Sequence, residues 1–145
     1  MDDKVPGFSE IGELKTKGPL ITLPYCWFSP IDTWDNPSMC AVDSYDLSGD
    51  TVEFRTRTYN RPDLLPVAKA LEYAEHRDYP AVLAYCASPA VARALVRTAP
   101  SSVFEVELKT KRIASGLESV TSDGGFTFVV AKHNGRWLVT RFSTN

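Results

Sequence analysis

Apolar and polar positions alternate over the last third of the chain, and this alternation predicts β-structure there. Residues 103–142 have the pattern of a three-strand antiparallel meander. Asn134 and Gly135 form the strongest short hairpin signal in the sequence and predict a tight turn before the last strand. The meander is therefore expected to be one antiparallel sheet.

Helical patterns fill the segment before this meander. Apolar residues recur at spacings of three and four over about 62–76, which predicts an amphipathic helix with Asn60 as its cap. Asp78 and Ser88 each stand one or two residues before a proline, a combination typical of helix starts. We therefore expect a second and a third helix to follow directly.

The first part of the chain is strand-like. Residues 1–18 are mostly polar and are expected to form a mobile arm, and residues 20–28 an extended segment. Residues 39–47 and 51–59 predict a hairpin. The expected fold is α+β, a curved antiparallel sheet with helices packed on one face and an N-terminal strand and hairpin extension. Residues 19–145 would form this single domain.

Composition narrows the classes of function. The chain has 145 residues and a net charge of −2, which gives no electrostatic case for nucleic acid. No apolar run is long enough to span a membrane, and no secretory signal is evident, so a cytoplasmic protein is expected. The three cysteines lack metal-ligand spacing and predict reduced thiols, with neither a disulfide framework nor a metal site. No cofactor motif is found.

A family resemblance covers residues 62–143. The stretch ALEYAEHRDYPAVLAYCASPAVARAL, followed by a meander that ends NGRWLVTRFS, resembles the nuclear-transport-factor-like superfamily, which includes ketosteroid-isomerase-like domains. The closing strand has that superfamily's Gly-x-Trp-hydrophobic pattern at Gly135, Trp137 and Leu138. The resemblance departs from the family because about 45 strand-like residues precede the helices.

The resemblance implies a cone-shaped α+β domain with an apolar mouth. Members of the superfamily act as isomerases, cyclases and dehydratases, as secretion and transport adaptors, and as immunity proteins that neutralise bacterial toxins. Such domains often pair through the convex face of the sheet, which makes a homodimer an expectation for this chain. Because one fold serves all these uses, the site must decide the function.

Four residues are candidates for catalysis. A cone enzyme needs a general base in an apolar pocket. Asp43 and Asp46 lie on opposite faces of one predicted strand, so one of them faces inward. Tyr45 could polarise a carbonyl oxygen. His76 stands at a predicted helix end, where offsetting the helix dipole is the competing role.

An aromatic loop and two arginines are candidates for binding. Trp27, Phe28 and Trp34 lie close together in sequence, and aromatic residues are enriched at the centres of interfaces. The competing interpretation is that Trp27 and Phe28 plug the open end of the core. Arg55 and Arg57 face away from the apolar side of their predicted strand and could dock an acidic partner.

Three functions follow in order of preference. The first is a non-catalytic protein-binding domain, in its concrete form an immunity-type antidote that docks on a toxin. The alternative is a small-molecule isomerase, cyclase or dehydratase with a pocket carboxylate, which requires an apolar cavity with converging polar groups. The third is a carrier of a small apolar ligand, which requires a deep pocket without titratable groups.

Overall fold

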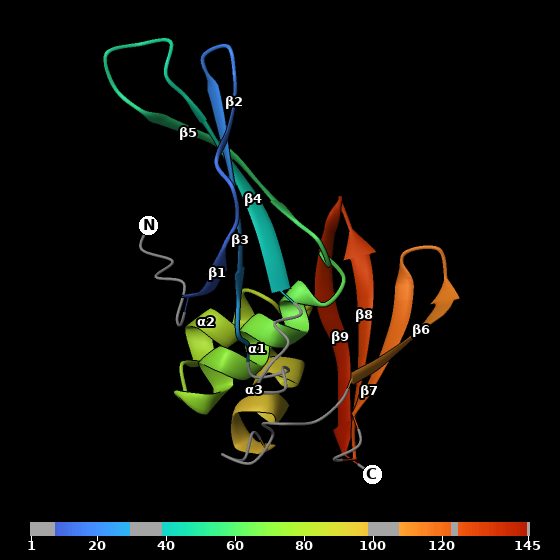
Figure 1. Ribbon diagram of the computed structural model, residues 1–145. Helices are drawn as coiled ribbons and strands as arrows, with labels where there is room; N and C mark the ends of the chain where they lie inside the picture. The colour runs from blue at the N-terminus through green and yellow to red at the C-terminus, as the bar shows by residue number, and fades with distance from the viewer. Residues whose placement is uncertain (1–7, 30–38, 99–107, 123–124, 145) are drawn as a thin grey trace. The chain divides into compact units, whose positions relative to one another are not determined.

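The protein is α+β, as the sequence predicts, and its described strands form two antiparallel sheets (Figure 1). The computed structural model describes residues 8–29, 39–98, 108–122 and 125–144. The chain divides into two compact units, which are Met1–Phe28 with Asn36–Arg61 and Ser29–Asp35 with Pro62–Asn145. The N-terminal strands thus form a sheet of their own instead of extending the sheet of the C-terminal part.

The N-terminal unit contains the first sheet. Its strands are β1 (Phe8–Ile11), β2 (Lys15–Lys17), β3 (Leu20–Trp27), β4 (Met39–Asp46) and β5 (Glu53–Tyr59). The strands β1, β3, β4 and β5 are neighbours in that order, and β2 also pairs with β3. The predicted hairpin is confirmed as β4 and β5, and the predicted extended segment is β3, which pairs with β4 along its whole length.

Part of the predicted mobile arm forms strands, since residues 8–17 contribute β1 and β2, while the mobility of residues 1–18 stays a prediction. Both strands pair with β3, and between them the amide of Gly12 donates to the carbonyl of Pro24 at 2.8 Å. Gly18, at φ 60°, makes the turn into β3. The polar composition of this segment gave no strand signal, but both strands pair with β3 through backbone hydrogen bonds, which polar residues form as readily as apolar ones.

Alternation along these strands gives the sheet two different faces. We call one the tyrosine face, which carries Tyr25, Trp27, Ala41, Asp43, Tyr45, Arg57 and Tyr59. We call the other the disulfide face, which carries Pro24, Cys26, Cys40, Val42, Asp46 and Thr58. Tyr25, Trp27 and Asp43 are at most 5% exposed, whereas Val42 is 41% exposed. The tyrosine face is therefore buried around Tyr25, Trp27 and Asp43, and the disulfide face is open to solvent at Val42.

A bulge interrupts the alternation predicted for β5. The register between β4 and β5 shifts at Ser44 and Tyr45, so that Tyr45 pairs with Phe54 while Asp43 pairs with Arg57. Sequence alternation placed Phe54 and Arg57 on opposite faces, and this is corrected here: the extra residue brings both to the tyrosine face. The guanidinium carbon of Arg57 lies 5.8 Å from the ring centre of Phe54.

The C-terminal unit holds the helices and the second sheet. Its elements are α1 (Leu65–Glu75), α2 (Tyr79–Leu83), α3 (Pro89–Thr98), β6 (Leu108–Ala114), β7 (Leu117–Ser122), β8 (Phe126–His133) and β9 (Arg136–Thr144). The sheet order is β6-β7-β8-β9. Helices α1 and α3 contact β9, and α2 packs on both helices (Figure 1). Val120, Phe128, Val130 and Val139 are fully buried, so the helices cover one sheet face, as predicted.

The second sheet has four described strands rather than the predicted three. Gly116, at φ 68°, turns the chain between β6 and β7, and the sequence analysis missed β7 because only Leu117 and Val120 in it are apolar. Asn134 and Gly135 have φ values of 51° and 79°, which confirms the predicted tight hairpin turn before β9. Residues 103–107 of the first predicted strand lie outside the described residues.

The helix starts agree with the sequence at two of three positions. The carboxylate of Asp78 accepts from the amide of Ala81 at the start of α2, and Ser88 caps α3. The predicted Asn60 cap of the first helix is wrong, since the Asn60 side chain accepts from the amide of Cys40 instead. Helix α1 begins five residues later without a side-chain cap.

No helix in the described ranges is long and apolar enough to cross a bilayer. The cone-like curvature of the sheet and the single domain over residues 19–145 stay predictions.

Candidate functional site

The candidate catalytic residue Asp43 lies at the centre of a hydrogen-bonded cluster on the tyrosine face. Arg57 Nε donates to Oδ1 at 2.8 Å and Nη2 donates to Oδ2 at 3.0 Å. The hydroxyl of Tyr25 donates to Oδ1 at 3.2 Å, and that of Tyr45 donates to Oδ2 at 3.3 Å. The sheet register explains this cluster: Arg57 is directly opposite Asp43 on β5, and Tyr45 is two residues further along the same face of β4.

The electrostatics of this cluster hold it in one charge state. Burial, together with the negative charge of Asp43, raises the pKa of the Tyr25 phenol above its ordinary value. The hydrogen bonds to Asp43 raise the pKa of the Arg57 guanidinium. Tyr25 and Arg57 therefore stay protonated at neutral pH, and both carboxylate oxygens of Asp43 accept bonds from neighbours. This geometry is that of a structural ion pair, and the assignment of Asp43 and Tyr45 to catalysis stays a prediction.

Asp46 lies on the opposite face of β4 and is held differently. The Ser48 amide donates to Oδ1 at 2.8 Å, and Arg55 Nη2 donates to Oδ2 at 2.8 Å. The hydrogen bonds from Ser48, followed by those from Arg55, lower the pKa of Asp46 from 3.8 to about 2. A general base at neutral pH needs a higher pKa. The geometry therefore favours a role for Asp46 in fixing the β4-β5 turn.

Two of the three aromatic binding candidates lie in the described part of the chain, and they differ in their exposure to solvent. Trp27 is 3% exposed, and its ring lies 5.8 Å from that of Tyr25 and 6.0 Å from that of Tyr59. Phe28, next to it, is 37% exposed. Trp34 lies outside the described residues. Burial of Trp27 agrees with the competing interpretation of a core side chain rather than a contact residue.

Of the two candidate arginines, only Arg55 is open to solvent. Its side chain is 52% exposed, whereas that of Arg57 is 24% exposed and is committed to Asp43. His76 is the exposed C-cap residue of α1 and belongs to the C-terminal unit, so the structure places it in a different compact unit from Asp43 and Asp46.

Sequence analysis missed a disulfide between Cys26 and Cys40, and the expectation of three reduced thiols is wrong. The two cysteines are directly opposite in β3 and β4. The amide and carbonyl of Cys40 both bond to Asn60, so the cysteine pair exchanges no backbone hydrogen bonds and its side chains approach closely. A partial signal was available in the strand predictions, since antiparallel pairing of 20–28 with 39–47 brings the two cysteines within one residue of a direct pair.

Cys86 is the remaining cysteine, and it is free and buried. Burial raises the pKa of its thiol to about 11. A thiol with that pKa carries almost no thiolate at neutral pH, so Cys86 is not suited to nucleophilic chemistry.

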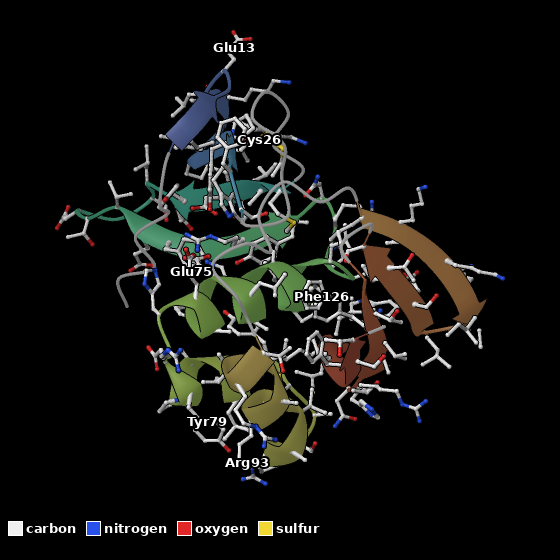
Figure 2. All side chains as sticks on the ribbon, turned by 90° about the horizontal axis from the view of Figure 1, so that it is seen from below. Glu13, Cys26, Glu75, Tyr79, Arg93 and Phe126 are labelled. Atoms are coloured by element: carbon white, nitrogen blue, oxygen red, sulfur yellow. A yellow bond between two sulfur atoms is a disulfide. The ribbon has the colours of Figure 1, made fainter. Side chains whose placement is uncertain are left out.

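An apolar hollow of about 210 Å³ lies at the disulfide, on the disulfide face of the sheet. Cys26, which is labelled in Figure 2, is one of its lining residues. Three strands line it, and alternation directs the side chains of Pro24, Cys26, Cys40, Val42 and Thr58 to this face. Its lining contains no Asp, Glu, His, Lys or Arg. The hollow can therefore take an apolar group but offers no general acid or base.

Metal chemistry has no evident place in the described part of the chain. No group of three or more His, Cys, Asp or Glu side chains there could hold an ion.

Comparison with protein-family models, with curated proteins and with solved structures gives no match for this chain. The resemblance to the nuclear-transport-factor-like superfamily accordingly stays a prediction, and the function must be argued from the geometry.

Proposed function

We propose that this protein is a non-catalytic protein-binding domain, and that an apolar side chain of its partner enters the hollow at the disulfide. The observation that carries the proposal is the hollow itself, which is apolar, open on an exposed sheet face and lined by no titratable carboxylate or histidine. Interfaces commonly centre on such pockets, each filled by one large side chain of the partner.

The size of the hollow favours a side chain over a free ligand. Its volume of about 210 Å³ is below the roughly 300–1,000 Å³ of clefts that bind small molecules. The surroundings also resemble an interface. The Ser44 and Thr56 hydroxyls are 2.6 Å apart on exposed strands, and the Arg55–Asp46 pair lies on the same strands. An apolar centre with a polar and charged rim is the usual composition of a docking surface.

The specific form of this proposal is an antidote that binds a toxin. This form rests on the superfamily resemblance and on the engaged state of both candidate carboxylates. An enzyme would need a carboxylate or histidine at the hollow, so the isomerase alternative is less favoured. The apolar lining of the hollow would suit a carrier of a small apolar ligand, but its volume of about 210 Å³ is small for such a ligand. A homodimer stays a prediction.

The disulfide also bears on location. Disulfides persist in oxidising compartments and are rare in the cytosol. We infer from the Cys26–Cys40 bond that the protein acts where thiols become oxidised, in place of the cytoplasmic location that the sequence predicts.

Two matched valine variants test the docking surface. Val42 lines the hollow and is 41% exposed, while Val52 is 65% exposed and lies outside it. Proteins from the native host would be captured on the wild type, on Val42→Asp and on Val52→Asp, and identified by mass spectrometry. A partner should be retained by wild type and Val52→Asp and reduced about tenfold or more on Val42→Asp, because a buried unpaired charge is costly.

The proposal fails if every retained protein binds the two variants equally, or if the wild type retains none. Native mass spectrometry of the captured material separates the alternatives, since a small molecule released without a protein partner would indicate a carrier. Circular dichroism of each variant shows whether the sheet is intact, so that loss of fold is not mistaken for loss of docking.

A further inference from the structure

The exposed side of α3 carries two arginines on one helical face. Arg93, Val96 and Arg97 follow at spacings of three and four, while Ala92 and Leu95 on the other side are fully buried. Together with Tyr79 of α2 they line a hollow of about 250 Å³ in the C-terminal unit. Figure 2 shows Tyr79 and Arg93 on neighbouring helices at the edge of this unit.

These arginines have no acidic partner in the part of the chain that the structure describes. Arg97 Nε donates a long hydrogen bond of 3.4 Å to the backbone carbonyl of Arg93. Among the described residues, the carboxylate nearest to them in sequence is that of Asp78, which accepts from the amide of Ala81 at the start of α2. Offsetting the dipole of α3 explains Arg97 in the last turn, but it leaves Arg93, one turn earlier, unexplained.

We propose that this hollow binds a phosphate monoester carried on a compact apolar body. Guanidinium groups bind phosphate with paired hydrogen bonds, and two of them one helical turn apart match the two negative charges of a monoester. A carboxylate carries a single negative charge and therefore neutralises only one of the two guanidinium charges. Val96 and the ring of Tyr79 form an apolar wall for the ester's body, and the Tyr79 hydroxyl supplies a further donor.

Phenyl phosphate, inorganic phosphate and benzoate are the probes for this site. They would be titrated into the full chain above pH 7, where the monoester is close to doubly charged, and followed by calorimetry and amide chemical shifts. Phenyl phosphate should bind saturably and about tenfold more tightly than benzoate, because each guanidinium contributes charge-assisted bonds. Inorganic phosphate should bind more weakly than phenyl phosphate, and equal binding would show that the apolar wall takes no part.

Charge-matched variants locate the binding. Arg93→Gln and Arg97→Gln should each weaken phenyl phosphate by about tenfold, and the double variant should lose saturable binding. Arg77→Gln removes an exposed arginine that does not line the hollow and should leave the affinity within about twofold, since exposed charges without direct contact are weakened by solvent and salt.

Absence of saturable binding to the wild type would overturn the proposal, as would equal binding of benzoate or an equal loss in Arg77→Gln. All three arginines are exposed, so the variants should melt like the wild type. A variant that melts earlier is replaced by the corresponding Lys substitution, which keeps the charge and should restore part of the affinity if phosphate is bound.

Discussion

The substitution Arg57→Met tests whether the Asp43 cluster is structural. It removes two bonds to a carboxylate that is 3% exposed, and among the described residues it leaves the hydroxyls of Tyr25 and Tyr45 as the remaining side-chain donors. Breaking a buried ion pair by removing one partner costs about 3–5 kcal/mol. Because a quarter of the Arg57 side chain is exposed and the two phenols remain, we expect the lower end, about 3 kcal/mol.

Urea unfolding provides the assay, followed by circular dichroism and by tryptophan fluorescence, to which Trp27 of the same sheet contributes. The companion variants are Asp43→Leu and the double variant. Removing both charges should cost less than the sum of the single effects by about 2 kcal/mol, since neither charge is then left unpaired. Arg55→Met serves as the control, because the Arg55 side chain is 52% exposed, and it should cause a much smaller loss.

The reasoning would be refuted by an Arg57→Met protein within about 0.5 kcal/mol of the wild type, which is the behaviour of a surface pair. Strict additivity of the two single variants would refute it as well, because a direct bidentate contact must appear as coupling.

Three further predictions concern the cysteines and Asp46. Replacing Cys26 and Cys40 by serine should lower the free energy of unfolding by about 3 kcal/mol, because the bond closes a loop with a sequence separation of 14; equal stability with and without reductant would contradict this. Cys86, with its pKa raised to about 11, should resist thiol reagents near neutral pH and react once the chain is unfolded in urea; rapid labelling of the native protein would count against its burial. Asp46 should titrate by NMR at a pKa of about 2, below its ordinary 3.8, and Arg55→Gln should raise that midpoint. Since the folded-state pKa is the lower one, the stabilising contribution of Asp46 is present above pH 3.8 and is lost as the pH falls to about 2; a midpoint unchanged from 3.8 would show that these hydrogen bonds do not persist in solution.

Local chemistry made some elements predictable from the sequence. Asp78 and Ser88 cap α2 and α3 because each has an acceptor side chain just before a proline. Asn134 and Gly135 form their turn because both tolerate positive φ. The interactions that decide each of these features lie within a few residues, so a short window of sequence contains them.

Features that depend on register were not predicted. Asn60 is a residue type that often caps helices, yet its side chain accepts a hydrogen bond from β4. Which of the two roles it takes depends on how far the β4-β5 pairing extends. The bulge moves Phe54 to the tyrosine face, because one unpaired residue reverses all the alternation beyond it. Counting outward from the predicted turn places Arg55 opposite Asp43, so the Asp43–Arg57 pair could not be predicted without the bulge, and the two residues were assigned separately as catalytic and binding candidates.

The positions of the two cross-strand links give the hollow its significance. The disulfide joins β3 to β4 on the open face, and the Asp43–Arg57 pair joins β4 to β5 on the buried face. The hollow is lined by these same three strands, at or beside the linked positions. A docking pocket gains affinity when its walls are fixed before the partner arrives, because less conformational freedom is lost on binding. If a partner docks there, reduction of the disulfide should weaken binding even under conditions where the sheet remains folded, and loss of affinity without loss of structure would separate this role from simple stabilisation.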